Sequence, residues 1–346
     1  HQNPDLVKPT LGPKEPWAYR NKMQMPVGGT KGDIQMGFYA MGSHDIVQGT
    51  NCPIQDEGNN IIAQACYQIA KEFDIEPYDE HTGKGVLRHI IGRIGQSGWM
   101  IILVTVTEQL PYKEKWVEKL TERIPQVETI VHNVNGKRTN VILGPKNNIL
   151  YGEGTITDHI KDLQFTLSPH SFFQVNPEQT TVLYDQALTY ADLKGDETVI
   201  DAYCGTGTIS LFLAHKAKHV IGIEIVEPAI INARENAKRN GYDNTEFIVA
   251  DAAVEMPKLY KAGVRPDVIV FDPIRAGCKE EVLTSAAGME PKRIVYVSCN
   301  PATMARDIEI LTHYGYELQE VQPVDMFPMT AHVEAVALLT RSKATQ

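Results

Sequence analysis

The sequence predicts an α/β fold in which a doubly wound, mostly parallel sheet follows an α+β domain. From residue 198 onward, short apolar segments alternate with segments of helical periodicity, as in parallel strands joined by crossover helices. The five expected strands are residues 198–201, 219–224, 246–250, 267–271 and 293–297. Two further strands, residues 317–321 and 332–340, have no helix between them and should form an antiparallel pair at one edge of the sheet.

Helices are expected on the links between these strands. Apolar residues recur at helical spacing near residues 208–217, 227–240, 279–287 and 302–314, and a longer helix over residues 178–191 comes first. Residues 164–346 should therefore form a Rossmann-like catalytic domain, in which ligands bind at the carboxyl ends of the strands.

The first 163 residues lack this regular alternation. Residues 1–16 are rich in proline and should form an extended arm that packs on the catalytic domain, and residues 17–163 should form an α+β domain. The expected elements of that part are strands at 22–27, 37–40 and 44–47 with a turn at 28–29, helices at 61–73 and 113–124, a hairpin of 87–94 and 99–107 around the turn 95–98, and strands at 127–133, 140–143 and 162–167.

Composition and charge limit the classes of function. Of 346 residues, 42% are hydrophobic, but no run of 18 apolar residues exists, so we expect no membrane span. A net charge of −10 argues against a protein that coats nucleic acid non-specifically, but it leaves room for a local basic patch. Two groups of basic residues are compatible with such a patch or with ordinary solvated surface: Lys8, Lys14, Arg20, Lys22 and Lys31, and Lys84, Arg88, His89 and Arg93.

Cysteine usage indicates a reducing compartment. The five cysteines, Cys52, Cys66, Cys204, Cys278 and Cys299, have no paired spacing and no C-x-x-C motif. We therefore expect free thiols, a cytoplasmic protein and no zinc knuckle.

The first three strands of the parallel sheet end in residues that suit S-adenosylmethionine. Asp201-Ala-Tyr203-Cys-Gly205-Thr-Gly207 places glycines where a cofactor can lie against the backbone, and an acidic residue before them suits a positive amino-acid group better than a pyrophosphate. Glu224 ends the next strand, where a carboxylate can bind ribose hydroxyls, and Asp251 follows the third strand, where it can meet an adenine edge. Together these residues predict an S-adenosylmethionine site.

The last parallel strand ends at a thiol. Cys299 follows the strand and precedes Asn300-Pro301, which should break the strand and start a helix. The positive end of that helix should favour the thiolate. A free cysteine is more often an inert core residue, so this position alone does not assign a nucleophile, and Cys278, which follows the Asp272-Pro273 turn, is a rival.

Five ordered motifs resemble those of the RNA (uracil-5-)-methyltransferase family, most closely its 23S rRNA branch in Gram-positive bacteria. They are Ser171-Phe-Phe-Gln-Val-Asn-Pro177, Asp201-Ala-Tyr-Cys-Gly-Thr-Gly207, Phe271-Asp-Pro-Ile-Arg-Ala-Gly277, Val297-Ser-Cys-Asn-Pro301 and Phe327-Pro-Met-Thr-Ala-His-Val-Glu334. The resemblance covers nearly the whole chain. It implies a Rossmann-like class I S-adenosylmethionine-dependent methyltransferase domain, preceded by an RNA-binding α+β domain.

The resemblance also implies roles for individual residues. Cys299 would be the nucleophile that adds to C6 of uracil, and Glu334 the base that removes the C5 proton. Phe172 would stack on a flipped-out base, with Arg275 beside the substrate. The residues implied or expected to contact the cofactor are Gln174, Tyr203, Gly205, Glu224, Asp251 and Asp272.

The chain departs from the family pattern in two respects. Ile274 stands where the family has a second proline, and we expect a changed turn with the chemistry kept. The N-terminal β-barrel domain and the cluster-binding cysteines of the family are also missing. Cys52 lies where relatives place the last ligand of a [4Fe–4S] cluster, but the other three ligands would precede His1, so we expect a plain thiol in this chain.

The expected activity is therefore methylation of uridine C5 in 23S rRNA by a monomeric enzyme. Three alternatives stay open. The substrate could be tRNA, the enzyme could methylate an exocyclic amine through Asp272-Pro273 without a thiol, or the chain could be a non-catalytic RNA-binding module. The sequence does not identify the uridine that is modified.

Overall fold

The computed structural model describes residues 3–342, which form two compact units. The C-terminal unit contains residues 3–14, Ile160–Gln164 and 171–342, and the N-terminal unit contains Glu15–His159 and Phe165–His170. The chain therefore passes between the units more than once around residues 160–170, where the sequence alone predicted a single boundary at residue 163. Each unit has its own sheet and its own buried core.

The C-terminal unit is built on a seven-stranded sheet with the order β12-β11-β10-β13-β14-β16-β15. Its strands are β10 (Thr198–Asp201), β11 (His219–Glu224), β12 (Thr245–Val249), β13 (Val268–Phe271), β14 (Arg293–Ser298), β15 (Tyr316–Val324) and β16 (Glu334–Arg341). The first five are parallel, whereas β16 pairs antiparallel with both β14 and β15. The predicted doubly wound sheet with an antiparallel edge pair is confirmed.

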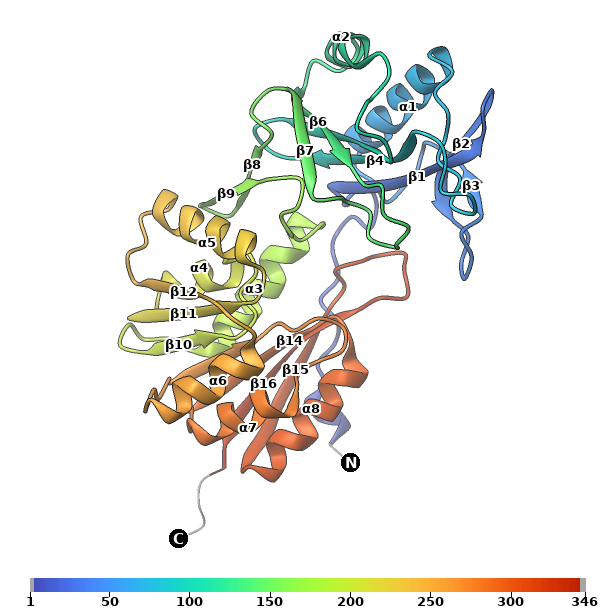
Figure 1. The fold of residues 1–346 in the computed structure, drawn as a ribbon. Helices are drawn as coiled ribbons and strands as arrows, with labels where there is room; N and C mark the ends of the chain where they lie inside the picture. Colours follow the sequence, from blue (N-terminus) through green and yellow to red (C-terminus); the bar gives the residue numbers. More distant parts are fainter. Residues whose placement is uncertain (1–2, 343–346) are drawn as a thin grey trace. The chain divides into compact units, whose positions relative to one another are not determined.

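Helices cover both faces of this sheet (Figure 1). One face carries α3 (Pro177–Ala191), α4 (Thr208–Ala214) and α5 (Glu227–Arg239), and the other carries α6 (Ala252–Lys261), α7 (Glu280–Gly288) and α8 (Pro301–His313). The sequence analysis missed α6, which is capped by Asp251 and contains Pro257. A proline inside a helix removes a backbone hydrogen bond and has a low helix propensity. The sequence of this short segment therefore does not predict a helix.

The edge strand β15 is covered by the N-terminal arm. After the 3₁₀ turn η1 (Pro4–Leu6), Val7 and Leu11 form parallel bridges with Val321 and Val324. Backbone bonds of 2.9 Å from the Lys8 N–H to the Val321 carbonyl and of 3.0 Å from the Leu11 N–H to the Pro323 carbonyl fix the arm there. The arm thereby satisfies backbone groups that an exposed edge would leave open.

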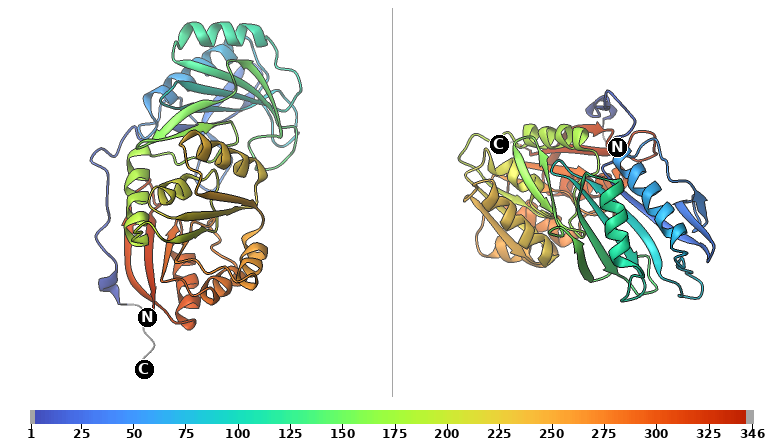
Figure 2. Two further views of the ribbon diagram at one scale, coloured as in Figure 1. Left: turned by 90° about the vertical axis from the view of Figure 1, so that its left-hand side faces the viewer. Right: turned by 90° about the horizontal axis from the view of Figure 1, so that it is seen from above.

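The N-terminal unit has a seven-stranded sheet with the order β3-β2-β1-β4-β5-β6-β7. Its strands are β1 (Lys22–Thr30), β2 (Asp33–Tyr39), β3 (Ile46–Gln48), β4 (Leu87–Ile94), β5 (Trp99–Thr105), β6 (Val127–Val134) and β7 (Lys146–Tyr151). Two helices, α1 (Glu57–Glu72) and α2 (Lys113–Arg123), lie side by side over one face (Figures 1 and 2). The short strands β8 (Ile156–Ile160) and β9 (Leu163–Leu167) form a separate pair.

Two local predictions for this unit were wrong. β1 continues through Gly28 and Gly29, and the turn falls at Lys31–Gly32 instead. Residues 140–143 are not a strand, because the Asn135 side-chain amide donates to the carbonyls of Val141 and Ile142 and holds them in a loop. Side-chain to backbone bonds of this kind compete with strand pairing. The predicted hairpin of β4 and β5 is confirmed.

No helix in the described part of the chain has both the length and the apolar character required to cross a membrane.

Candidate active site

The carboxyl ends of three strands in the C-terminal unit bring polar residues to one edge of the sheet. Asp201 ends β10 and is paired with Val270 of β13, so Asp272 lies two residues further, just past the end of the neighbouring strand. Phe271 is paired with Tyr296 of β14, and Cys299 comes three residues after that tyrosine. Because these strands are parallel, Asp201, Asp272 and Cys299 all lie at their carboxyl ends, where open α/β sheets place their ligands.

Cys299 and Glu334 are brought together by the antiparallel pairing of β14 and β16. The last pair of this ladder is Ser298 with Ala335. One further step outward places Cys299 opposite Glu334, and residues opposite each other in an antiparallel pair project to the same face. Glu334 is also paired with Val324 of β15, which fixes its backbone on that side.

The electrostatics around Cys299 contradict the prediction of a stabilised thiolate. Burial raises the pKa of the half-buried Cys299 thiol, and the carboxylates of Glu334 and Asp272 raise it further. The Arg275 guanidinium opposes this effect. The helix end that follows Cys299 was visible in the sequence, whereas the two carboxylates come from distant segments, and their effect on the thiol could not be predicted.

The carboxyl groups at this edge are buried (Asp201 and Glu334) or half-buried (Asp272) and hold protons more tightly than usual. Burial raises the pKa of Glu334, which is 4% exposed, to about 7. The pKa of Asp272 is raised well above its usual range, first by burial and then by Glu334 and Asp201. Strongly shifted carboxyl groups that cluster in this way are typical of functional sites. The cluster would also attract a positively charged ligand, because such a ligand offsets the mutual repulsion.

Asp201 offers a direct test of whether a cationic cofactor fits. Its carboxylate is fully buried, and the Ser210 hydroxyl donates to Oδ2 at 2.6 Å. Its other oxygen, Oδ1, is buried without a hydrogen-bond partner of good geometry among the described residues, although backbone groups of Tyr203 and Ser210 lie near enough to lower the pKa of this carboxyl. Burial raises the pKa of Asp201 to about 6. An unpaired buried acceptor is costly, so a donor such as the ammonium of S-adenosylmethionine fits this position.

The glycine loop after β10 is held in an unusual backbone conformation. Gly205 and Gly207 have φ values of 54° and 82°, which side-chain-bearing residues rarely adopt. The Glu224 carboxylate accepts from the Gly205 N–H at 3.3 Å and from the Val226 N–H at 2.9 Å. Asn236 donates to the Thr206 carbonyl at 3.1 Å. Glu224 therefore lies beside the loop, as the prediction of a cofactor site requires, and Asn236 is a support that the sequence did not reveal.

Asp251 lies at the predicted strand end, but its carboxylate already has partners. Oδ1 accepts from the Ala253 N–H at 2.9 Å and so caps α6, and Oδ2 accepts from Lys279 Nζ at 2.9 Å. The contact with an adenine edge therefore stays a prediction. Any such contact would have to share the carboxylate oxygens with Lys279, whose ammonium lowers the pKa of Asp251.

The loop before α3 presents an exposed aromatic ring next to the glycine loop. Phe172 is 69% exposed, whereas Gln174 is buried at 7%. The Phe172 carbonyl accepts from the Thr206 hydroxyl at 3.3 Å, and the Ser171 hydroxyl accepts from Asn232 at 3.1 Å. These bonds tie the segment to the glycine loop and to α5. A large ring held open to solvent on an anchored loop is suited to stacking on a ligand.

The loop after Asp272 is fastened to the start of α8. The Arg275 carbonyl accepts from the Asn300 amide at 3.0 Å and from the Thr303 hydroxyl at 3.2 Å. Asn300 also caps α8 by accepting from the Ala302 N–H at 3.2 Å. Because Asn300 directly follows Cys299, its side chain links the Asp272 loop to the segment that carries the thiol. The sequence did not reveal this role. Ile274 is 77% exposed in this loop.

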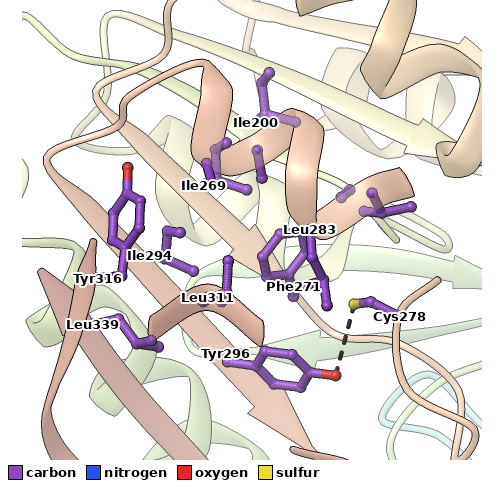
Figure 3. Close-up of a cluster of buried hydrophobic side chains, with 14 of the residues drawn as sticks. Ile200, Ile269, Phe271, Cys278, Leu283, Ile294, Tyr296, Leu311, Tyr316 and Leu339 are labelled. Carbon is purple, nitrogen blue, oxygen red and sulfur yellow. Dashed lines mark hydrogen bonds between the residues drawn. The ribbon is translucent and has the colours of Figure 1, made fainter. Parts of the chain in front are cut away.

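Cys278 is a poor candidate for the nucleophile. It is 6% exposed, and it packs in the hydrophobic core beside Tyr296, with 3.6 Å between its sulfur and the tyrosine oxygen (Figure 3). The Asp307 carboxylate accepts from the Tyr296 hydroxyl at 2.5 Å and from the Cys278 N–H at 2.7 Å. Tyr203 also hydrogen-bonds to the Cys278 sulfur. Burial raises the pKa of Cys278 to about 12, so this thiol is structural.

Three other cysteines lie outside this arrangement. Cys66 and Cys204 are buried, and burial raises the pKa of each thiol. Cys52 is half-buried in the N-terminal unit, and all five thiols are free. Within residues 3–342, no group of three or more His, Cys, Asp or Glu side chains is placed to hold a metal ion. The expectation that Cys52 is a plain thiol in this chain stays a prediction.

Comparison with known proteins points to one family. The family model described as tRNA (Uracil-5-)-methyltransferase matches residues 100–342. An uncharacterized RNA methyltransferase of Halalkalibacterium halodurans is 53% identical over 335 residues, which cover 96% of this chain and 73% of that protein. A second one, from Clostridium acetobutylicum, is 51% identical over 339 residues, with 97% and 73% covered.

A solved structure extends the similarity to the fold. The crystal structure of Pyrococcus abyssi tRNA (uracil-54, C5)-methyltransferase in complex with S-adenosyl-L-homocysteine is 28% identical to this chain, with a TM-score of 0.80. The match covers 96% of this chain and 78% of that one. The C-terminal unit is thus a class I S-adenosylmethionine-dependent methyltransferase domain, as the sequence predicted.

The raised pKa of Glu334 predicts a pH-dependent cost in stability. A carboxyl whose pKa rises from 4.5 to about 7 on folding stabilises the folded state when protonated, and this contribution is lost as the pH rises toward 7. Glu334→Gln cannot ionise, so we expect the variant to be more stable than the parent at pH 8 by on the order of 2 kcal/mol. At pH 4.5 the two should unfold alike.

Thermal unfolding at both pH values measures this difference, which should shift the Tm by a few degrees. Glu309→Gln, at an exposed position on α8, is the matched control and should show no such pH dependence. Equal melting temperatures of Glu334→Gln and parent at pH 8 would contradict the buried, raised-pKa state of Glu334.

Proposed function

The chain belongs to the tRNA (uracil-5-)-methyltransferase family. We propose that it methylates C5 of a uridine, and that this uridine lies in 23S rRNA, because the five motifs resemble the 23S rRNA branch. Family membership makes the chain an S-adenosylmethionine-dependent RNA methyltransferase. The observation that best supports the proposed chemistry is the β14–β16 ladder, which pairs Ser298 with Ala335 and so brings Cys299 near Glu334, with both Glu334 and Asp272 close enough to perturb the thiol.

The proposed reaction starts at Cys299. C5 of uracil is a weak nucleophile, so the thiolate first adds to C6, and the electron pair of the C5–C6 double bond moves to give an enolate. S-adenosylmethionine, when bound, would supply the methyl group as an electrophile, and S-adenosylhomocysteine would leave with the electron pair of the broken S–C bond. After a bond forms between C5 and the methyl carbon, Glu334 takes the C5 proton. The electron pair of that C–H bond restores the double bond, and the C6–S bond breaks to release Cys299.

The remaining site residues have supporting roles in this proposal. Asp201 would hold the ammonium of the cofactor and Glu224 its ribose hydroxyls, and Gln174, Tyr203, Gly205 and Asp272 would complete the cofactor site. Phe172 would stack on the flipped-out uracil, because its ring is exposed on an anchored loop. Arg275 would lie near the reacting base and counter the carboxylates that raise the pKa of Cys299. We further propose a cytoplasmic monomer.

The thiol mechanism makes a specific prediction about covalent adducts. RNA that carries 5-fluorouridine at the target position has no C5 proton for Glu334 to remove, so the parent chain should become covalently attached to it. Cys299→Ala should form no adduct and lose at least about 1000-fold in turnover, the scale expected for a covalent nucleophile. Denaturing gel electrophoresis measures the adduct. Cys52→Ala, at the other half-buried thiol, is the matched control and should behave like the parent.

Cys299→Ala should form no covalent adduct on ordinary RNA, whereas Glu334→Gln should accumulate one. The variant can still add and methylate, but it cannot remove the proton, so it should accumulate a methylated covalent complex. An enzyme that methylates an exocyclic amine needs no thiol. Full activity of Cys299→Ala, together with no trapping by 5-fluorouridine RNA, would favour that alternative.

The pH profile should report the same two residues. Glu334 must be ionised and Cys299 must become a thiolate, and both pKa values are raised. We therefore expect kcat/KM to rise with pH through about 7 and to keep rising beyond pH 8, since the thiol titrates later. A profile that falls between pH 6 and pH 8 would contradict these assignments. Measurement of kcat/KM at a series of pH values across this range tests the prediction.

The RNA class requires its own experiment. The five motifs resemble the 23S rRNA branch, whereas tRNA is named both in the description of the matching family model and for the Pyrococcus abyssi structure, so tRNA is the second candidate. Unmodified 23S rRNA and unmodified tRNA transcripts should be incubated with the chain and the methyl donor. Mass mapping should find 5-methyluridine in the 23S rRNA, and 5-methyluridine found only in the tRNA would reverse the assignment.

A further inference from the structure

The N-terminal unit contains a cavity of about 630 Å³. Its walls come from β1, β2 and β4 and from the segments around residues 44–46, 78–81 and 138–142, all within this one unit. The volume lies in the range of ordinary ligand sites. None of the residues assigned to methyl transfer lines it.

Two strongly buried polar side chains line this cavity and have unused hydrogen-bonding atoms. Arg88 and His89 are 5% and 6% exposed. Arg88 donates from its terminal nitrogens to the carbonyls of Asn135, Lys137 and Thr139, but its Nε has no partner. His89 Nδ1 is also buried without a partner. Buried donors and acceptors of this kind are costly unless a ligand satisfies them.

The state of His89 favours an uncharged partner. Burial and the neighbouring Arg88 lower the pKa of His89 to about 3, so the ring is neutral at physiological pH. A neutral imidazole presents one N–H donor and one acceptor nitrogen. His89 Nδ1 can therefore serve as the acceptor, and together with the Arg88 Nε–H donor it matches the donor and acceptor edge of a nucleobase.

An aromatic platform stands at the same cavity. The rings of Tyr39 and His44 are stacked, with centroids 4.8 Å apart and planes inclined by 16°, and Tyr39 is 42% exposed. A 2.7 Å bond from His44 Nδ1 to Glu80 holds this pair. Arg138 donates to the carbonyls of Glu80 and His81 and ties the two rim segments together. The platform is therefore preorganised for stacking a further ring.

The charges of the lining disfavour phosphate. Arg88 and Arg138 contribute two positive charges, whereas Asp45, Asp79 and Glu80 contribute three negative ones. The Asp79 carboxylate is occupied by the N–H of His81 and the hydroxyl of Thr82, and these bonds lower its pKa, so it stays ionised. An anion would thus be repelled, while a neutral ring with polar edges would not.

We propose that this cavity binds one unpaired nucleobase of the RNA substrate, distinct from the uridine that is methylated. The base stacks on the Tyr39–His44 pair, and its edge bonds to His89 and Arg88. This inference rests on the proposed function in one respect, namely that the substrate is RNA. It assigns to the N-terminal unit the reading of a second base, which contributes to the choice of RNA.

Tyr39→Ala tests the platform in the full chain. Stacking of one base on an aromatic side chain contributes enough for its loss to weaken RNA binding by about 5- to 100-fold. Tyr39→Phe keeps the ring and should bind within about twofold of the parent. Tyr151→Ala is the matched control, because Tyr151 is 43% exposed in the same unit and does not line the cavity. Melting temperatures of all three variants show whether each is folded.

The readout is the Kd for a substrate RNA fragment, measured by fluorescence anisotropy without the methyl donor. RNAs with a single abasic position, scanned across the fragment, identify the base involved. Removal of the base at one position other than the target uridine should weaken RNA binding to the parent but not to Tyr39→Ala. The abasic position and the Tyr39→Ala substitution would each remove the same contact. Equal Kd values for Tyr39→Ala and Tyr151→Ala would overturn the proposal.

The outcomes separate this proposal from the proposed methylation. If the chain forms no 5-methyluridine but RNA binding depends on Tyr39, the methylation proposal fails and the base site stands. If methylation occurs and Tyr39→Ala binds RNA like the control, the base site fails alone. Free uridine and adenosine monophosphates form a third arm. If the binding of either monophosphate depends on Tyr39 while the binding of RNA does not, the cavity is a site for a free nucleotide, and its role in RNA recognition is overturned.

Discussion

The pairing register of β14 with β16 is the constraint on which the site depends. Cys299 and Glu334 are 35 positions apart in the sequence, and they meet only because Ser298 pairs with Ala335. A slip of one residue would move every side chain of β16 to the opposite face of the sheet, including Glu334. The register is well specified, because β16 is held between β14 and β15 and carries buried apolar residues along most of its length. The last strand of the chain thus completes the site by inserting next to the thiol.

This arrangement places acidic groups where they are costly to the folded protein. Asp201, Asp272 and Glu334 are all desolvated, and burial is the largest cause of each raised pKa. A sheet of this kind would be more stable with apolar residues at these positions. The cost is explained if a positive ligand occupies the site, since a cation near the carboxylates lowers their pKa values and also that of Cys299. In that case the thiol becomes reactive mainly when the cofactor is bound.

Much of the fold could be predicted from local patterns. The parallel strands, the antiparallel edge pair and the β4–β5 hairpin follow from apolar runs and turn residues, which act over a few positions. The helix α6 was missed because Pro257 interrupts its pattern, and residues 140–143 were misassigned because the Asn135 side chain bonds to their backbone and holds them as a loop. The direction of the Cys299 pKa was also wrong, because Glu334 and Asp272 reach the thiol only through tertiary structure. The cavity residues are likewise separated, with Tyr39, Arg88 and Arg138 on three different segments.

The net charge of −10 determines how such a chain can recognise RNA. A basic protein gains most of its affinity from phosphates, which carry no sequence information. An acidic chain has little of that long-range attraction, so contacts with bases must contribute more. The structure offers two features suited to such contacts: the exposed Phe172 ring in the C-terminal unit, and the aromatic, nearly neutral cavity of the N-terminal unit. Stacking and edge contacts act only at short range and only on unpaired bases. A chain that binds mainly through them would select RNA by the presence of accessible bases, which is also the condition for bringing a uridine to Cys299.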